Sequence, residues 1–142
     1  MTNVVGWREW VALPDIGIKA LKCKVDTGAK NSALHAFDVK PFERNGELWV
    51  RFSIHLDDLD LTKIQMSEAK VIDTRQVIDS SGNRSERFFI ETQLEIGHHK
   101  FLIQLSLTDR DTMKYNMLLG RTALRKAQMI VDPSHSYRQG KK

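Results

Sequence analysis

Residues Lys24 to Ala36 read K-V-D-T-G-A-K-N-S-A-L-H-A, and this stretch decides the fold. It begins within an alternating run, Ala20 to Val25, that predicts a short β-strand. An acid, a hydroxyl residue and a glycine follow directly, Asp26, Thr27 and Gly28. One interpretation is a plain turn, because Asp and Thr side chains bond nearby backbone groups and glycine readily takes a positive φ. The other is a catalytic carboxylate held in a fixed loop at a strand end.

Size and composition favour one soluble domain spanning residues 1–142. No apolar run approaches the length of a membrane span, and no secretory leader is visible, so a cytoplasmic protein without a membrane partner is expected. One cysteine, Cys23, excludes an intrachain disulfide and a cysteine-rich zinc site. The net charge of +4 and the pI of about 9.3 favour an anionic partner.

Short alternating runs separated by turn signals predict a mainly β, antiparallel, barrel-like domain. Asn45-Gly46 is the strongest hairpin signal in the chain. Strands are expected at Trp7–Leu13, Ala20–Val25, Phe37–Phe42, Leu48–His55, Lys70–Ile78, Arg87–Ile96, Lys100–Leu107 and Met129–Pro133.

The remaining segments are expected to be less regular. Residues 57–68 are acidic and poorly periodic, which predicts a loop or an insertion, and residues 138–142 are expected to form a flexible tail. Gly120 to Gln128 is the one segment with a helical pattern, and Thr122 is its expected N-cap.

Two motifs, in order, give the Asp-Thr-Gly loop a family context. The pattern D-T-G-A-x-x-[ST]-x-L followed by apolar-apolar-Gly-Arg-x-x-Leu resembles the retroviral-type aspartic proteases, the retropepsins. The residues that match are Asp26, Thr27, Gly28, Ala29, Ser32 and Leu34, then Leu118, Leu119, Gly120, Arg121 and Leu124. The resemblance implies a closed acid-protease β-barrel with one short C-terminal helix.

A bacterial retropepsin-like family is more similar still. Its members are called ATP-dependent zinc proteases or RimB-like proteins, and they often occur beside RimK-type glutamate ligases. The chain resembles this family at Gly6–Trp10, Lys24–Ala36, Met117–Arg121 and Val131–Tyr137.

The resemblance implies a mechanism with two carboxylates that share one proton, one activating water and the other polarising the peptide carbonyl. The sequence has one D-T-G, so Asp26 would meet Asp26 of a second chain in a symmetric homodimer. Thr27 would brace the two loops, and Gly28 would let the backbone approach the carboxylates closely. Residues expected to support the loop and the dimer are Ser32, Leu119, Gly120 and Arg121.

Lys30 departs from the retroviral pattern. Retroviral enzymes commonly carry an acid at this position, and it pairs with the arginine of Gly-Arg. Arg121 is therefore expected to find another partner, either Asp132 or Asp109.

A flap and a substrate class also follow from the resemblance. The hairpin Val77 to Arg87 is the candidate lid, with its tip at Ser80 to Asn83. Cations near the loop and flap favour a peptide or protein substrate, with a glutamate-rich one as the specific candidate; they are Lys30, Arg75, Arg84 and Arg87. The residues expected to bind substrate are Ala29, Lys30, Ser81, Gly82 and Arg87.

No cofactor is expected. The sequence contains neither H-E-x-x-H nor a phosphate-binding G-x-x-x-x-G-K-[ST] motif, so neither a metal site nor ATP binding is predicted. Two other functions stay open: a non-catalytic peptide-binding module of the same fold, and an RNA-associated factor that uses the positive charge alone. Nucleic acid is the less favoured partner, because aromatic residues do not alternate with Lys and Arg along the sequence.

Overall fold

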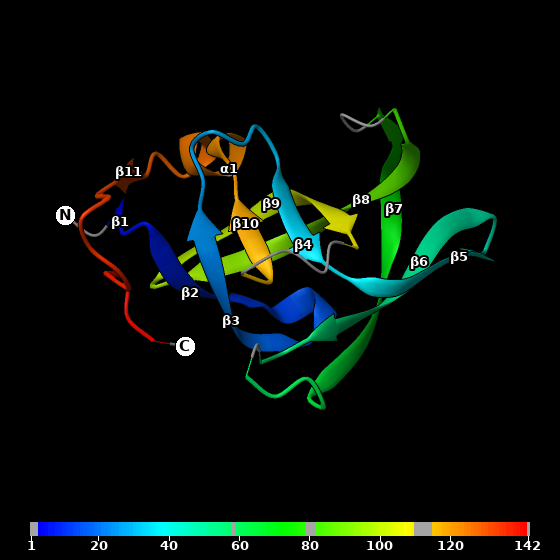
Figure 1. The fold of residues 1–142 in the computed structure, drawn as a ribbon, viewed down its shortest axis with the longest axis horizontal. Coiled ribbons are helices and arrows are strands. Elements are labelled where there is room, and N and C mark those ends of the chain that lie inside the picture. Colours follow the sequence, from blue (N-terminus) through cyan, green and yellow to red (C-terminus); the bar gives the residue numbers. More distant parts are fainter. Residues whose placement is uncertain (1–2, 58, 79–81, 110–114, 142) are drawn as a thin grey trace.

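The computed structural model describes residues 3–57, 59–78, 82–109 and 115–141. Strands dominate this part of the chain, with one short α-helix, α1 (Arg121–Lys126), and one 3-10 turn, η1 (Pro14–Ile16) (Figure 1). The strands are β1 (Val4–Val5), β2 (Arg8–Leu13), β3 (Ile18–Val25), β4 (Ser32–His35), β5 (Phe37–Arg44), β6 (Glu47–His55), β7 (Ile64–Ile78), β8 (Arg84–Ile96), β9 (His99–Thr108), β10 (Met117–Leu119) and β11 (Ile130–Val131).

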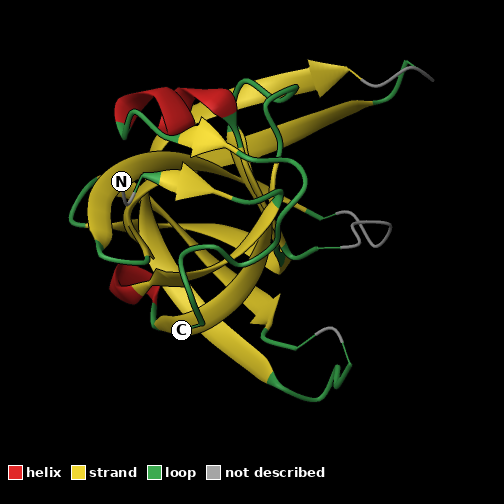
Figure 2. Ribbon diagram, turned by 90° about the vertical axis from the view of Figure 1, so that its left-hand side faces the viewer, coloured by secondary structure: helices red, strands yellow, loops and turns green. Residues whose placement is uncertain are grey.

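Six strands close into a barrel in the order β2-β3-β10-β4-β9-β8, and a pairing of Ala12 with Glu95 joins β2 back to β8. Figure 2 shows these strands curling around the interior. Most neighbours are antiparallel, but β3–β10 and β4–β9 are parallel. The expected mainly β closed barrel with one short helix is confirmed.

Strands β7, β6 and β5 extend the same sheet beyond the barrel, and β1 pairs with β11 in a separate two-stranded sheet. The β5–β6 hairpin turns at Asn45-Gly46, where both residues have positive φ, 53° and 76°, as the sequence signal predicted. The β7–β8 hairpin pairs out to Ile78 and Arg84 and contains the segment that was predicted to act as a flap. Residues 79–81, which include the predicted tip residues Ser80 and Ser81, lie outside the described residues.

A continuous apolar core fills the barrel. Its largest fully buried side chains come from strands on all sides and include Leu13, Leu21, Leu34, Ile90 and Leu105. Burying such side chains contributes about 1.5–3 kcal/mol each relative to leaving them exposed. Within the described residues, no helix is both long enough and apolar enough to cross a bilayer.

The expected loop at 57–68 is wrong from Ile64 onward, where β7 begins and pairs with β6. The pattern misleads because it is inverted: Met66 is 63% exposed, whereas Ser67 is buried and its hydroxyl donates to the Ile16 carbonyl at 2.6 Å. Ile64 and Met66 alternate with polar residues but face solvent, and the alternation breaks at Glu68, so no continuous apolar face marks this part of the strand.

Two smaller expectations at the C-terminal end are also wrong. Helix α1 is shorter than expected, and its N-cap is Gly120, without a side-chain cap, instead of Thr122. The expected flexible tail is held at its first two residues, because the backbone N–H groups of Arg138 and Gln139 donate to the Glu9 carboxylate at 2.9 and 3.1 Å.

Candidate active site

Strand β10 lies between β3 and β4, although β3 and β4 are consecutive in the sequence. Leu119 pairs with Val25 on one side, and Leu118 pairs with Ala33 on the other. The connection between β3 and β4 must therefore pass around the end of β10, as Figure 1 shows at its top edge. This crossing connection, residues 26–31, contains the Asp-Thr-Gly sequence and is called the Asp26 loop below.

The Asp26 loop is fixed by its own backbone and by β10. The Asp26 N–H donates to the Leu119 carbonyl at 2.9 Å, and the Ala29 N–H donates to the Asp26 carbonyl at 3.2 Å. The Gly28 N–H donates to Oδ1 of the Asp26 carboxylate at 3.0 Å, which orients the acid. Because Asp26 is only half-buried and Thr27 and Gly28 are exposed, the carboxylate sits on a surface open to a ligand or to a second chain.

The residues that follow β10 pack directly behind this loop. The Gly120 N–H donates to the Ser32 hydroxyl at 3.0 Å, and the Arg121 N–H donates to the Ala29 carbonyl at 2.8 Å. A Cβ on Gly120 would lie 2.6 Å from backbone atoms of Asn31, so only glycine fits. The structure thus brings Ser32, Leu119 and Gly120 together with Asp26; their effect on the dimer stays a prediction.

Arg121 does not pair with Asp132 or Asp109, and that expectation is wrong. Its Nη1 donates to the backbone carbonyls of Gly28 at 3.1 Å and Thr27 at 3.5 Å. Asp132 instead contacts Ser134, His135 and Arg138. The guanidinium therefore needs no acid after D-T-G-A, because loop carbonyls serve as its acceptors, and Lys30 is tolerated for that reason.

A cavity of about 410 Å³ opens beside the Asp26 loop. It brings together three predicted substrate-binding residues, Ala29, Lys30 and Arg87. The other residues that line it are Asn31, Ala33, Arg75, Gln76, Phe89, Ser106, Thr108 and Leu118. The cavity is thus formed by the Asp26 loop, the β7–β8 hairpin at the base of the predicted flap, and strands β4, β9 and β10.

The cavity is positively charged. Lys30, Arg75 and Arg87 contribute cations, and the described lining residues include no acid. The Arg75 guanidinium lies 4.4 Å from the Phe89 ring centroid and pairs through Nε with Asp73 at 2.8 Å. Asp73 thus offsets part of the Arg75 charge.

The predicted flap meets the loop at its base. Arg75 and Gln76 of β7 and Arg87 of β8 line the cavity, whereas Gly82, near the far end of the hairpin, is exposed with a φ of +83°. Ser81, the other predicted tip contact, lies outside the described residues. Substrate contacts by Gly82 and Ser81 stay predictions.

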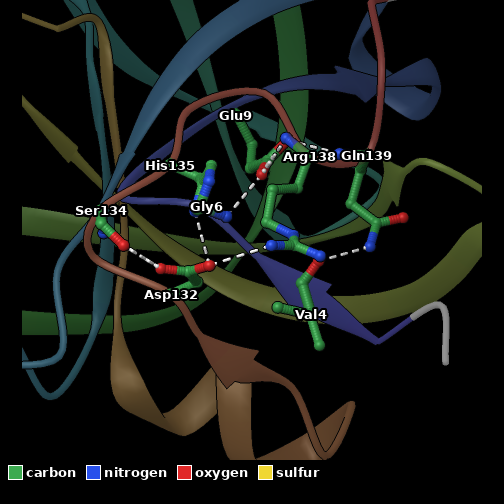
Figure 3. A network of polar contacts seen from close by, with 8 residues as sticks. All are labelled: Val4, Gly6, Glu9, Asp132, Ser134, His135, Arg138 and Gln139. Carbon is green, nitrogen blue, oxygen red and sulfur yellow. Dashed lines mark hydrogen bonds and ion pairs between the residues drawn. The ribbon is translucent and has the colours of Figure 1, made fainter.

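Sequence reasoning missed a buried acid that joins both ends of the chain. Glu9 is fully buried, and its carboxylate accepts the Gly6 N–H at 2.6 Å in addition to the N–H groups of Arg138 and Gln139 (Figure 3). The Gln139 side chain also donates to the Val4 carbonyl at 2.7 Å. The sequence contained a sign of this burial. Glu9, Val11 and Leu13 are alternate residues of β2, so their side chains point to the same, buried face of the strand.

The histidine nearest to Asp26 in the sequence is His35, the last residue of β4. It is buried, and its Nδ1 lies 3.2 Å from the Thr108 carbonyl. Among the described residues, no three His, Cys, Asp or Glu side chains are gathered as a metal would require.

This chain is similar to known proteins in both sequence and structure. Residues 4–142 match the family model described as RimB-like, "Retropepsin-like aspartic endopeptidase RimB". A structural-genomics crystal structure of a Legionella pneumophila protein of unknown function superposes with a TM-score of 0.82 and 25% identity, covering 98% of this chain and 99% of that one.

Curated relatives are longer. Proteins named "Probable alpha-L-glutamate ligase" from Shewanella halifaxensis and Shewanella pealeana are 41% and 40% identical to this chain over 94% and 98% of its length. The chain spans only 29% and 30% of those relatives. The match over nearly the whole chain, together with the Asp26 loop crossing β10, shows that the chain belongs to the RimB-like family of retropepsin-like aspartic endopeptidases.

Proposed function

We propose that the chain is an aspartic endopeptidase that works as a symmetric homodimer. The observation that carries the proposal is the Asp26 loop, whose carboxylate is oriented by the Gly28 N–H and left half-exposed beside a cavity. In the dimer, Asp26 of each chain would lie close to the other. One carboxylate would take a proton from the attacking water, and the protonated partner would donate a hydrogen bond to the scissile carbonyl.

The need for a partner follows from the chemistry. Two carboxylates about 3 Å apart share one proton, because like charges so close cannot both ionise, and the pair titrates as a unit. One chain supplies only one such carboxylate in its Asp26 loop. Thr27 and Gly28 are exposed there and are available to contact a second loop.

The proposed substrate is a peptide rich in glutamate, trimmed after a ligase has extended it. Two observations support this class: the cations of Lys30 and Arg87 in the cavity, and the relatives named as glutamate ligases. Carboxylate side chains would meet complementary charge in the cavity. A tail added to a ribosomal protein by a RimK-type ligase is one substrate of this kind.

Cleavage of a peptide with an oligo-glutamate tail tests the function, using wild type and Asp26→Asn with and without a zinc chelator. We expect wild type to cut in both conditions and Asp26→Asn to be inactive. Loss of activity with chelator and full activity in Asp26→Asn would contradict the aspartic mechanism. Unchanged cleavage by Lys30→Glu and Arg87→Glu would contradict selection by charge.

A second candidate function is a non-catalytic module that binds an acidic chain. The observation that favours it is that the chain matches about 30% of the length of proteins named as ligases. A domain that holds the substrate would be useful in such a protein. Under this alternative, wild type and Asp26→Asn bind the oligo-glutamate peptide equally and neither cuts it. A protein that stays monomeric at micromolar concentration would agree with the same alternative.

A further inference from the structure

A second cavity, of about 480 Å³, lies on the outer face of β2 and β3, beside the segment that joins β6 to β7 and the start of β10. Trp10, Leu56 and Tyr115 provide an apolar and aromatic surface, and Lys22, Lys63 and Lys141 surround it with ammonium groups. The proposed peptidase chemistry uses none of these six residues.

Positive charge is in excess in this cavity, because its lining includes three lysines and one acid, Asp57. Nζ of Lys22 lies 5.4 Å from the Trp10 ring centroid, and Nζ of Lys141 lies 5.7 Å from it. Lys63 is the lysine whose charge is offset, since its Nζ is 3.8 Å from the carboxylate of Asp57. Across the described part of the chain, the ammonium groups of Lys22 and Lys141 make no ion pair with a carboxylate.

Residues of two motifs that the proposed peptidase chemistry does not use, Gly6–Trp10 and Val131–Tyr137, pack behind these cations. The Arg8 guanidinium, from G-W-R-E-W, donates to the Tyr115 hydroxyl and to the Ser136 hydroxyl, both at 3.1 Å. It also lies 4.6 Å from the Trp7 ring centroid and 5.0 Å from that of Tyr137. Because the Tyr115 oxygen accepts from Arg8, its own proton is left to be donated to a ligand.

These contacts discriminate between two kinds of anionic polymer. Single-stranded nucleic acid binds by stacking bases on aromatic faces, but Trp10 is already contacted by the ammonium groups of Lys22 and Lys141, and Tyr115 packs edge-on against Trp7. A glutamate side chain fits better, because its methylenes pack on an apolar floor and its carboxylate reaches an ammonium rim. Charge complementarity of this kind attracts and orients an acidic chain.

The position of the cavity relates it to Asp26. Lys22 and Asp26 are four residues apart on and just past β3, about 13 Å along an extended strand. We propose that this cavity is an exosite that holds glutamate side chains of an acidic peptide. The peptide residues bound here would lie at least about four extended residues along the peptide from those at the Asp26 loop. Its part in turnover rests on the proposed peptidase function, whereas its binding does not.

Binding is tested on the Asp26→Asn protein with a fluorescent oligo-glutamate of about ten residues, which is longer when extended than the stretch from Lys22 to Asp26. Adding Lys22→Ala and Lys141→Ala is expected to raise Kd about tenfold or more. The matched control is Lys19→Ala with Lys40→Ala, which removes the same charge at exposed positions outside the cavity lining and should change Kd less than about twofold. Circular dichroism checks that each variant is folded.

Three results would overturn the exosite. Equal weakening by the control pair would mean that net charge alone attracts the peptide. An effect of Lys30→Ala with Arg87→Ala, and none of Lys22→Ala with Lys141→Ala, would place all binding in the cavity beside Asp26. Tighter, Lys22-dependent binding of an oligo-uridylate of equal length would mean that the site recognises phosphate polymers.

Cleavage separates this proposal from the peptidase function. With wild type, kcat/KM should be higher for a tail of about ten glutamates than for one of about three, and Lys22→Ala with Lys141→Ala should remove that gain while leaving the short substrate unchanged. If nothing is cut but the binding pattern holds, the peptidase proposal fails and the exosite stands. If both tails are cut equally well by wild type, the exosite has no role in turnover.

Discussion

The hydroxyl of Ser32 accepts a hydrogen bond from the backbone N–H of Gly120 at 3.0 Å, although the two residues are 88 positions apart. Both residues are buried, and this bond ties the far end of the Asp26 loop to the junction of β10 and α1. The loop that presents the acid is therefore shaped by residues from the opposite end of the chain.

Ser32→Ala is expected to lower the free energy of unfolding by about 1–3 kcal/mol, because the buried Gly120 N–H loses its acceptor. Urea unfolding followed by circular dichroism measures the change. Ser85→Ala, at an exposed position of β8, is the control and should alter stability by less than about 0.5 kcal/mol. Equal stability of the two variants would mean that another group satisfies Gly120.

Gly120→Ala is expected to destabilise the protein by about 1–3 kcal/mol and to displace the Asp26 loop. The new Cβ would lie 2.6 Å from backbone atoms of Asn31 and 2.9 Å from the Ala29 carbonyl, and backbone cannot yield as a flexible side chain can. Gly46→Ala provides the comparison, because nothing lies within 4 Å there and only its φ of +76° penalises a side chain. The peptidase assay and urea unfolding should both rank Gly120→Ala as the more damaging change.

Mixing wild type with an equal amount of Asp26→Asn is expected to reduce the rate of peptide cleavage to about half, since random pairing places half of the wild-type chains in mixed dimers. The rate is measured at constant wild-type concentration after the chains have exchanged. An equal amount of Lys40→Ala, which retains Asp26, should raise the total rate instead. A cleavage rate that is unchanged when Asp26→Asn is added would contradict a shared active site.

The pKa of Asp132 is lowered from 3.8 to about 2, chiefly by the hydroxyl and N–H of Ser134 and then by His135. A carboxyl whose pKa is lower in the folded state stabilises the fold above its unfolded pKa and loses that effect as the pH falls toward the folded value. The midpoint temperature of thermal unfolding should therefore fall less steeply between about pH 4 and pH 2 for Asp132→Asn than for wild type. Identical profiles would mean that the contact with Ser134 is not maintained in solution.

Burial, with a smaller contribution from the charge of Glu9, raises the pKa of the Cys23 thiol to about 12. The thiolate is the reactive form, so folded protein at about pH 8 should not react with a chromogenic disulfide reagent. In urea the single thiol should react fully. Rapid reaction without urea would show that β2 and β3 separate in the native state.

Sequence reasoning reached the barrel because its main signals are local. The Asn45-Gly46 turn and the alternation of long strands such as β8 depend on residues near one another, and both were found. Strands β4 and β10 were not identified as strands, since four and three residues give no period to detect. The start of β7 was lost because Met66 faces solvent and Ser67 faces the core.

The candidate site was predictable in part for a related reason. Asp26, Gly120 and Ser32 belong to motifs that resemble those of the retropepsins, and that resemblance implied that they lie close together. The acceptors of Arg121 could not be predicted, because backbone carbonyls leave no trace in a sequence. The aromatic and cationic surface around Trp10 escaped as well, since its residues come from both ends and the middle of the chain.

The parallel pairing of β1 with β11, at Val4–Ile130 and Val5–Val131, has a consequence for larger assemblies. Both ends leave the fold on one flank, as Figure 1 shows at its left side. Any segment joined by a linker at either end would thus be tethered to the same side, and its effective concentration near that flank would depend on linker length.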